Sequence, residues 1–353
     1  MVQRGHGTSK LVLFHSGSST KKKGSQSTFV LLLEDGRTIA QNGWRWHRSG
    51  MTERQDSALE KLPSGTVTPS LRAGIGLALG GGFARGFAHL GVLKVLRQHQ
   101  ISVSHIAGSS VGSILGAAYA SGAPLERIIE ACRRLRFRDI ARWRVSRLGL
   151  ASNQRLGELV ERVFGSRQFE DLEIPVAVVA TDLCSGEPVV FTQGNLVDAI
   201  RASCAFPGLF EPVEIGTRCL ADGGLVAPVP TEAARSMGAQ TVIGVSVGFE
   251  DGNGGVPTNI FQVVSRAVSA AQKHQLELWE RHADLVLRPD VQSLAWDDFA
   301  RADEAIEAGA VAARHALPRI EKLLERAAEA EFPMEARLFL EQRSDMELKE
   351  VQA

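Results

Sequence analysis

From Ala73 onward, short apolar runs alternate along the chain with stretches in which apolar residues recur at helical spacing. The apolar runs predict buried strands at residues 75–79, 104–107, 176–182, 189–191 and 241–247. The helical spacing predicts helices at residues 87–99, 113–121, 124–135, 154–164, 196–203, 230–237, 260–282 and 302–326. Nearly continuous apolar strands alternating with helices are typical of an α/β domain, so we predict a mainly parallel sheet flanked by helices.

The two ends of the chain lack this periodicity. Residues 1–72 are rich in Gly, Ser, Thr and Lys, so we expect a disordered N-terminal extension with one short hairpin, formed by residues 29–33 and 37–40. Met51 could be the native start; detection of a native N-terminus before Met51 by mass spectrometry would reject this hypothesis. We expect one α/β domain over residues 73–326, followed by a charged tail, 327–353, that is peripheral as a solvated helix or as disorder.

Composition narrows the function classes. The 353 residues are 44% hydrophobic, enough for a substantial core. Forty basic and forty acidic residues leave no formal net charge, which argues against nucleic acid as a partner. The four cysteines have neither metal-ligand nor disulfide spacing and are expected to be reduced. No apolar run approaches the roughly 18 residues of a membrane span. The sequence therefore predicts a cytoplasmic protein and leaves its oligomeric state open.

A serine nucleophile is indicated by Gly108-Ser109-Ser110-Val111-Gly112, which lies between an apolar run and a helical stretch. Glycines on both sides let the backbone turn sharply, and the following helix directs its positive end at the Ser110 hydroxyl. The pentapeptide alone is equally compatible with a tight turn of small residues that only packs. Two further segments favour catalysis.

The first is a glycine-rich segment, Gly80-Gly81-Gly82-Phe83-Ala84-Arg85-Gly86, between a strand and a helix. Consecutive N–H groups at a helix start suit a phosphate or an oxyanion. The second is Asp222-Gly223-Gly224, which offers a carboxylate at a glycine turn, although aspartate commonly caps such turns without any chemical role. A donor loop, a nucleophile and a base thus follow one another along the chain.

Together these segments resemble the patatin-like phospholipases, a family of serine lipid acyl hydrolases, and in particular its bacterial single-domain members. The resemblance covers roughly residues 74–324 and rests on ordered blocks at 79–93, 108–116, 180–183 with 186–187, 199–203 with 207–210, and 222–224 with 228–230. It implies the family's three-layer fold and a Ser110–Asp222 dyad that lacks histidine. It further implies phospholipase A, lysophospholipase or esterase activity. No calcium-binding motif is evident in the sequence, so we expect the reaction to need no metal, and we expect no cofactor.

The same resemblance places the oxyanion hole at Gly81, Gly82, Phe83 and Arg85. Phe83 departs from the family pattern, because it stands where the third glycine of the loop is expected. If that position requires a positive φ, phenylalanine is strained there, and a hole formed by Gly80-Gly81-Gly82 is the alternative. Arg85 has two alternative roles: it orients the loop or adds positive charge beside it, or it forms a structural salt bridge.

Other function classes fit parts of the pattern. An α/β-hydrolase would complete a triad from Ser110, Asp222 and a later histidine, which could be His274, His282 or His315. A dinucleotide-binding module shares the strand, glycine loop and helix, but Arg85 occupies the position of its third glycine, and no acidic residue ends the next strand. A non-catalytic relative is disfavoured by the presence of both Ser110 and Asp222. His89 and His105, near the motifs, are expected to be structural.

An arginine-rich segment, residues 133–155, contains eight arginines and one acidic residue, Asp139. Apolar residues are interleaved with them, including Phe137, Trp143 and Leu148. Such a segment suits an anionic bilayer surface, with arginines on the phosphates and aromatic side chains inserted; a solvated helical hairpin is the alternative. We therefore expect a lipid or phospholipid ester as substrate and a peripheral membrane contact through residues 133–155.

Overall fold

A computed structural model describes residues 74–331, apart from 145, 165–167, 249–255 and 274–275, together with three strands nearer the N-terminus. The chain divides into two compact units, Met1–Leu71 and Arg72–Ala353. In the first unit, β1 (Leu11–Ser16), β2 (Thr28–Leu33) and β3 (Thr38–Gln41) form an antiparallel sheet. β2 and β3 pair as the expected hairpin does. The rest of residues 1–72 lies outside the described residues, so the disordered extension stays a prediction.

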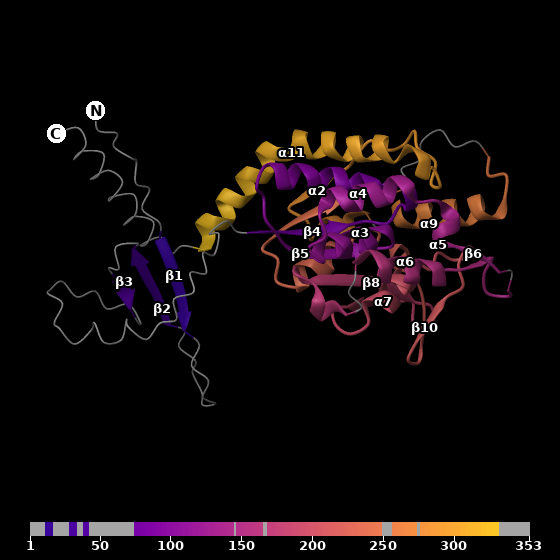
Figure 1. Ribbon diagram of the computed structural model, residues 1–353, viewed down its shortest axis with the longest axis horizontal. Coiled ribbons are helices and arrows are strands. Elements are labelled where there is room, and N and C mark those ends of the chain that lie inside the picture. The colour runs from indigo at the N-terminus through magenta and orange to yellow at the C-terminus, as the bar shows by residue number, and fades with distance from the viewer. Residues whose placement is uncertain are drawn as a thin grey trace. The chain divides into compact units, whose positions relative to one another are not determined.

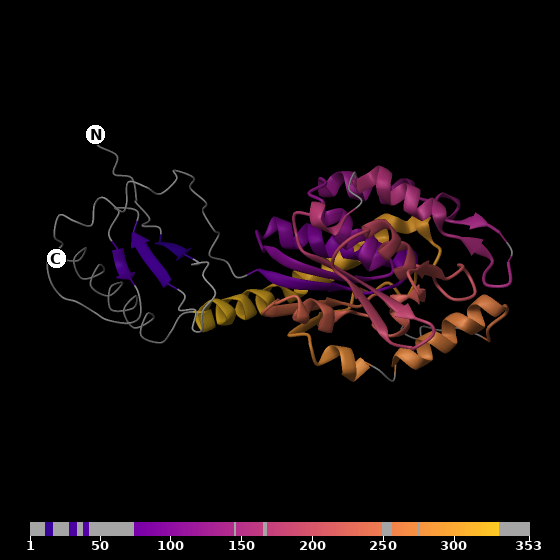
Figure 2. The ribbon, with the colours of Figure 1, turned by 90° about the horizontal axis from the view of Figure 1, so that it is seen from below.

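The described part of the second unit contains an eight-stranded sheet, in the order β10, β11, β8, β5, β4, β12, β13, with β9 also paired to β8 (Figures 1 and 2). Its strands are β4 (Ile75–Leu79), β5 (Val103–Ser109), β8 (Val176–Asp182), β9 (Pro188–Phe191), β10 (Val213–Ile215), β11 (Arg218–Asp222), β12 (Thr241–Val245) and β13 (Leu285–Leu287). The strands from β8 to β13 along this order pair in parallel. Strands β9 and β11 pair antiparallel with β8, and β10 pairs antiparallel with β11. The predicted mainly parallel sheet is confirmed.

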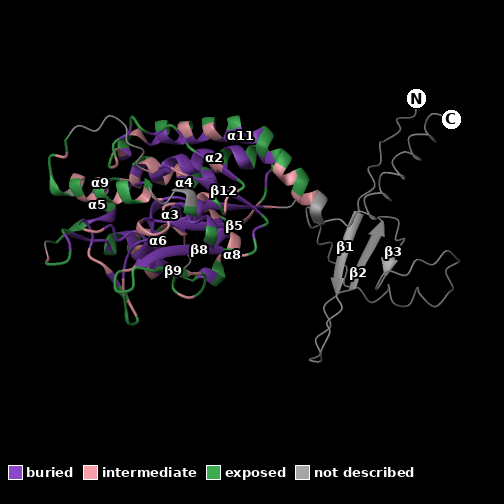
Figure 3. Cartoon of the chain, turned by 180° about the vertical axis from the view of Figure 1, so that it is seen from behind, coloured by how far each residue is buried: buried purple, intermediate pink, exposed green. Residues whose placement is uncertain are grey.

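Helices cover both faces of this sheet and give the three expected layers. Because side chains alternate across a strand, Leu77 and Leu79 of β4 enter one core while Ala78 enters the other. The larger core includes residues of α2 (Ala88–Gln98), α3 (Val111–Ala120), α4 (Leu125–Arg134), α6 (Gln154–Phe164), α7 (Leu196–Ser203) and α11 (Ala302–Glu331). The smaller core packs α8 (Thr231–Ser236) and Trp279 of α10 (Leu276–Glu280). Figure 3 shows the buried sheet between more exposed helices.

Most predicted elements lie within two residues of the observed ones. The expected helix 260–282 is instead divided into α9 (Ile260–Lys273) and α10. Helix α11 continues past residue 326, since alanine favours helix and occupies positions 327, 328 and 330. The hydrophobic pattern missed β10, β13 and the pair β6 (Arg142–Trp143) and β7 (Ala151–Ser152), because strands of two or three residues are too short to display a period. Residues 332–353 of the predicted tail lie outside the described residues.

Strand β8 brings two distant segments together. Strand β9 pairs with residues 178–181 of β8, β5 with residues 176–179, and β11 with residues 180–182. A strand has two edges and β9 occupies one of them, so β5 and β11 must share the other, end to end. Strand β5 ends at Ser109 opposite Val179, and β11 ends at Asp222 opposite Ala180. Ser110, directly after β5, and Asp222, the last residue of β11, are therefore brought next to each other along the same edge of β8.

Candidate active site

Ser110 occupies the turn between β5 and α3, where its backbone has φ of +52° and ψ of −127°. This conformation is uncommon for a residue with a side chain and persists only where the surroundings hold it. The Ser110 N–H donates to the Ser203 hydroxyl at 2.9 Å, and that hydroxyl donates to the Val179 carbonyl at 2.6 Å. The Ser110 carbonyl accepts from the N–H and the hydroxyl of Ser113. Both sides of the turn are therefore anchored.

The glycines that flank the serine allow close packing. A Cβ at Gly108 would lie 2.4 Å from the Ser113 Cα, and a Cβ at Gly112 would lie 2.1 Å from the Leu79 carbonyl oxygen. The residue of this turn with a positive φ is Ser110 itself. The sharp turn is present as expected, but its glycines are required by the closeness of neighbouring backbone and not by their own dihedral angles.

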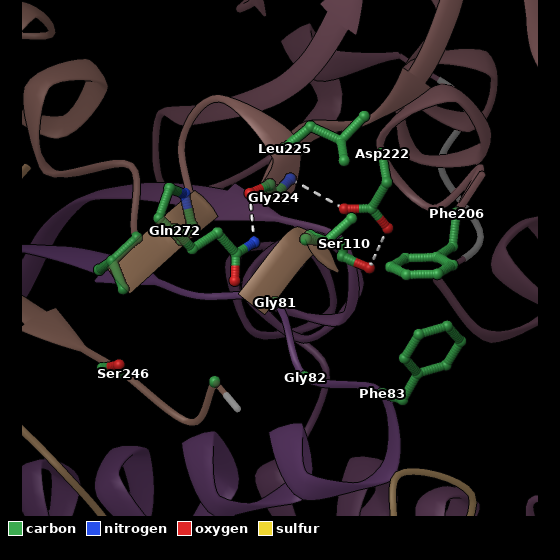
Figure 4. A pocket seen from close by; sticks show the side chains of 14 residues that line it. Gly81, Gly82, Phe83, Ser110, Phe206, Asp222, Gly224, Leu225, Ser246 and Gln272 are labelled. Atoms are coloured by element: carbon green, nitrogen blue, oxygen red, sulfur yellow. Dashed lines mark hydrogen bonds between the residues drawn. The ribbon is translucent and has the colours of Figure 1, made fainter. Parts of the chain in front are cut away.

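Asp222 faces Ser110 from the end of β11 (Figure 4). The Ser110 hydroxyl donates to Asp222 Oδ2 at 2.7 Å, and Oδ1 accepts from the Gly224 N–H at 2.8 Å. Burial raises the pKa of Asp222 from 3.8 to about 6, although these two hydrogen bonds act in the opposite direction. A carboxyl group with this pKa is mostly ionised at neutral pH and is a stronger base than an ordinary aspartate.

The backbone around Asp222 is also fixed. Its N–H donates to the Ala205 carbonyl at 3.0 Å, and its carbonyl accepts from the Thr181 hydroxyl at 2.8 Å. A Cβ on Gly223 would lie 2.0 Å from the Val179 carbonyl oxygen, so a side chain cannot be placed directly after Asp222. These contacts leave the carboxylate little freedom to leave Ser110.

A thiol lies close to the pair. Cys204 is buried, and burial, followed by the charge of Asp222, raises the pKa of its thiol. A thiol that stays protonated is a poor nucleophile. Cys204 therefore does not compete with Ser110 in this environment.

The glycine-rich loop runs beside the serine, between β4 and a 3-10 helix, Phe83–Phe87. Gly81, Gly82 and Phe83 line one pocket together with Ser110. A Cβ on Gly81 would lie 3.3 Å from the Ser110 Cβ. The Gly81 N–H donates to the Pro228 carbonyl at 3.2 Å and so is used within the protein.

Phe83 has φ of +50°, so the position where the family pattern places a glycine does require the left-handed conformation. A side chain there costs on the order of 1–2 kcal/mol. Its ring contacts those of Phe206 and Trp296, with centroids 5.5 and 5.1 Å away. Each such aromatic pair contributes about 0.5–1.5 kcal/mol, which can offset the backbone strain.

Arg85 lies away from the pocket lining. Its Nε donates to the Leu294 carbonyl at 2.8 Å, and burial lowers the pKa of its guanidinium. The contact ties the end of the glycine-rich loop to a segment more than 200 residues later in the chain. Of the loop residues expected to form the oxyanion hole, Gly81, Gly82 and Phe83 lie beside Ser110. Arg85 lies away from Ser110 and holds the end of the loop through its hydrogen bond to Leu294.

The histidines are engaged elsewhere or lie apart. His89 is fully buried, pairs through Nε2 with the Gly80 carbonyl at 2.8 Å, and burial lowers its pKa to about 4. His105 pairs with the neighbouring Ser104 hydroxyl, and His315 is exposed on α11. Within the described residues, no histidine forms a hydrogen bond with Ser110 or Asp222. His274 lies outside the described residues.

Several pocket residues carried no recognisable sequence signal. Phe206 and Leu225 lie near Asp222, and Gln272 donates from α9 to the Gly224 carbonyl at 2.5 Å. Phe206, Leu225 and Gln272 come from segments whose local pattern indicates only a helix or a turn. Outside the pocket lining, the Ser203 hydroxyl accepts from the Ser110 N–H and so holds the turn.

Two kinds of feature are absent from the described residues. None of the helices there is both long and apolar enough to span a bilayer. Likewise, that part of the chain contains no group of three or more His, Cys, Asp or Glu side chains arranged to hold a metal ion.

Known proteins resemble this chain in sequence. The family model described as patatin-like phospholipase matches residues 77–235, which include the glycine-rich loop, Ser110 and Asp222. An uncharacterized NTE family protein of Mycobacterium tuberculosis is 39% identical over 176 residues, which cover 49% of this chain and 49% of that protein. The human patatin-like phospholipase domain-containing protein 6 is 35% identical over 190 residues, 50% of this chain and 14% of that protein.

Two further similarities extend over more of the chain. Lysophospholipase NTE1 of Debaryomyces hansenii is 28% identical over 281 residues, 70% of this chain and 18% of that enzyme. The crystal structure of VipD from Legionella pneumophila has a TM-score of 0.43 and 14% identity, covering 70% of this chain and 67% of that one. The chain spans about half the length of the mycobacterial relative and less than a fifth of the human and yeast ones. The family-model match and the NTE family relatives show a patatin-like phospholipase domain over residues 77–235 of this chain.

Proposed function

We propose that the chain is a serine lipid acyl hydrolase in which Ser110 is the nucleophile and Asp222 the general base. The observation that carries the proposal is the 2.7 Å hydrogen bond from the Ser110 hydroxyl to a buried carboxylate at the wall of a pocket. A serine hydroxyl becomes an effective nucleophile when an adjacent base accepts its proton.

The proposed reaction has two halves. Ser110 Oγ attacks the ester carbonyl carbon while Asp222 takes the hydroxyl proton; the intermediate then expels the alcohol, to which Asp222 returns the proton. The acyl group is left bonded to Ser110. A water molecule next gives a proton to Asp222 and attacks the acyl carbon, and the serine oxygen leaves with that proton as the carboxylic acid is released.

The developing negative charge on the carbonyl oxygen needs donors, and we assign this role to the glycine-rich loop around Gly82. The Gly81 N–H is used by Pro228, so in our proposal it supports the loop. The loop lies within van der Waals reach of Ser110, as an oxyanion hole must.

The pocket lining supports an apolar acyl group next to the reacting ester. Around Ser110 and Asp222 the wall is largely apolar, formed by Phe83, Phe206, Leu225, Val229 and Val268. The yeast relative is named a lysophospholipase, which together with the family supports a phospholipid or lysophospholipid ester as substrate. Fluorophosphonate labelling with peptide mapping, followed by a panel of phospholipids, lysophospholipids and simple esters, tests the proposal. Labelling of a residue other than Ser110 would overturn it.

The oxyanion assignment predicts that Gly82→Ala lowers kcat about 10²–10³-fold, the usual cost of losing one donor. A Cβ at Gly82 would lie 2.9 Å from the backbone oxygen of Val247, so the added methyl group must displace the loop. Gly248→Ala is the matched control, because Gly248 lines the same pocket but has no atom within 4 Å of a new Cβ. Both rates are measured on a chromogenic ester, and equal kcat in the two folded variants would contradict the assignment.

The general-base role predicts how turnover depends on pH. Only ionised Asp222 accepts a proton, and burial raises its pKa to about 6. We therefore expect kcat/KM to be level above about pH 7 and to fall about tenfold per pH unit below about pH 5. The measurement uses a chromogenic ester, with circular dichroism at each pH to verify folding. Activity that stays level down to about pH 4 would show that no group with this pKa is the base.

The alternative is a triad that includes His274, His282 or His315. Replacement of each by alanine distinguishes the two mechanisms, because turnover collapses when a triad histidine is lost. Under our proposal all three variants keep the reaction. The exposed position of His315 and the direct contact between Ser110 and Asp222 favour the dyad.

A further inference from the structure

The eight arginines of residues 133–155 form two groups. Four are held by the protein: Arg133 pairs with Asp303 and Arg134 with Glu130, and Arg136 and Arg155 donate to backbone carbonyls. The second group is exposed, and none of its side chains forms a hydrogen bond or an ion pair with any part of the chain that the structure describes. It consists of Arg138, Arg142, Arg144 and Arg147. Among the described residues, four positive charges on one short stretch are thus left without a protein partner.

Exposed apolar side chains accompany these charges. Trp143 is 66% and Leu148 69% exposed, both at the hairpin formed by β6 and β7. The base of this hairpin is well anchored, since the N–H groups of Leu150 and Ala151 both donate to the Leu209 carbonyl. An anchored hairpin that exposes a tryptophan and a leucine to water indicates a surface that binds something apolar.

A row of aromatic rings connects this hairpin with the pocket. Trp143 contacts Phe137 at 5.8 Å between ring centroids, and Phe137 contacts Trp296 at 6.1 Å. Trp296 contacts Phe83 at 5.1 Å, and Phe83 contacts Phe206 at 5.5 Å. The last two line the pocket that contains Ser110. An apolar path therefore extends from the exposed hairpin to the candidate nucleophile.

Helix α9 provides a second exposed apolar region next to the pocket. Val268 and Gln272 of α9 line the pocket, while Ile260 at the start of the helix is 70% exposed and Val256 before it 86%. Figures 1 and 2 both show α9 and the β6 hairpin at the same end of the domain. Exposed apolar residues thus lie on α9, which lines the pocket, and on the β6–β7 hairpin, which the aromatic row connects to the pocket and which also carries exposed arginines.

We propose that the β6–β7 hairpin and the first turn of α9 form the surface with which this protein docks on an anionic phospholipid bilayer. The four unpaired arginines complement lipid phosphates and anionic headgroups, and Trp143, Leu148 and Ile260 enter the interfacial region. Docking in this way places the aromatic row between the bilayer and Ser110. Delivery of a lipid ester along it rests on the proposed hydrolase function, whereas binding to the bilayer does not.

The test is sedimentation with vesicles of phosphatidylcholine alone and of phosphatidylcholine mixed with phosphatidylglycerol. It is carried out with Ser110→Ala protein, so that the result is independent of turnover. We expect stronger binding to the mixed vesicles, and weaker binding at about 1 M NaCl, where the screening length is about 3 Å. The triple change Arg142→Glu, Arg144→Glu and Arg147→Glu should weaken binding about 100-fold or more, and Trp143→Ala should weaken it at every salt concentration.

The matched control carries three charge reversals on α11, Arg319→Glu, Lys322→Glu and Arg326→Glu, at exposed positions. It should bind like the parent protein. In an otherwise wild-type chain, the hairpin triple variant should keep hydrolysis of a small soluble ester and lose hydrolysis of lipid in mixed vesicles. Equal binding by hairpin and control variants, or no preference for mixed vesicles, would overturn the docking surface. Hydrolysis of the soluble ester that persists in Ser110→Ala would contradict the proposed function but not the docking surface. The two failures are therefore distinguishable.

Discussion

Ser110→Ala is expected to abolish ester hydrolysis and fluorophosphonate labelling, with kcat lowered on the order of 10⁶-fold, as when the serine of a serine protease is removed. The substitution deletes the attacking oxygen but keeps the backbone groups that hold the turn, since those bonds involve the Ser110 N–H and carbonyl. The fold should therefore persist, as measured by circular dichroism and thermal unfolding. Mass spectrometry of the labelled peptide identifies the reacting residue.

The neighbouring serine provides the control. Ser109→Ala removes the same atom one residue away, where the hydroxyl donates to the Ala227 carbonyl at 2.7 Å. It should cost about 1 kcal/mol of stability and leave labelling intact. Labelling that survives in Ser110→Ala, or that disappears equally in Ser109→Ala, would contradict the assignment of the nucleophile.

Asp222→Asn is expected to lower kcat by about 10⁴-fold, because the amide keeps the shape of the side chain but cannot accept the serine proton. The Gly224 N–H can still donate to the amide oxygen, so the local geometry is retained. Asp182→Asn is a suitable control at the end of β8, where that carboxylate accepts from the Cys184 N–H. Near-normal turnover in Asp222→Asn would remove Asp222 from the mechanism.

The same substitution should raise stability at neutral pH. The pKa of Asp222 in the folded protein, about 6, lies above its ordinary value of 3.8, so folding favours the protonated form. The contribution of Asp222 to the free energy of unfolding is fully present below about pH 4. It falls by about 3 kcal/mol in total as the pH rises through 6. An asparagine is never ionised and avoids this loss. Thermal unfolding should thus show a higher Tm for Asp222→Asn at about pH 7.5 and a smaller difference at about pH 5; a lower Tm at neutral pH would contradict the burial argument.

Local patterns predicted much of the fold. The bounds of β4, β8, α6 and α7 agree with the expected ones, because each has an apolar period that depends only on neighbouring residues. The two-residue strands that carry Trp143 and Ala151 left no such period, and their pairing depends on contacts with Leu209. The sequence therefore predicted the arginine-rich composition of residues 133–155 but not the β6–β7 hairpin within them.

The role of Phe83 shows a similar division. Its position in a glycine-rich loop marks it as a departure from the family pattern. The positive φ of Phe83 appears only in the folded loop, and the rings that it contacts, Phe206 and Trp296, lie more than 100 residues away along the chain. The use of the Gly81 N–H by Pro228 is likewise a long-range contact. Which donors of the loop remain for an oxyanion depends on these partners.

By itself the sequence determined the α/β class, the turn that carries Ser110, the glycine turn after Asp222 and the cluster of arginines, since each is encoded within a few consecutive residues. Only the tertiary structure decided that Ser110 and Asp222 meet, because they lie at the ends of two strands that share one edge of β8. It also decided the base strength of Asp222, since the pKa depends on burial by the whole domain. Similarly, the separation of paired from unpaired arginines depends on partners such as Asp303, 170 residues from Arg133. Distance along the chain carries no information on such contacts; the packed sheet and helices create them.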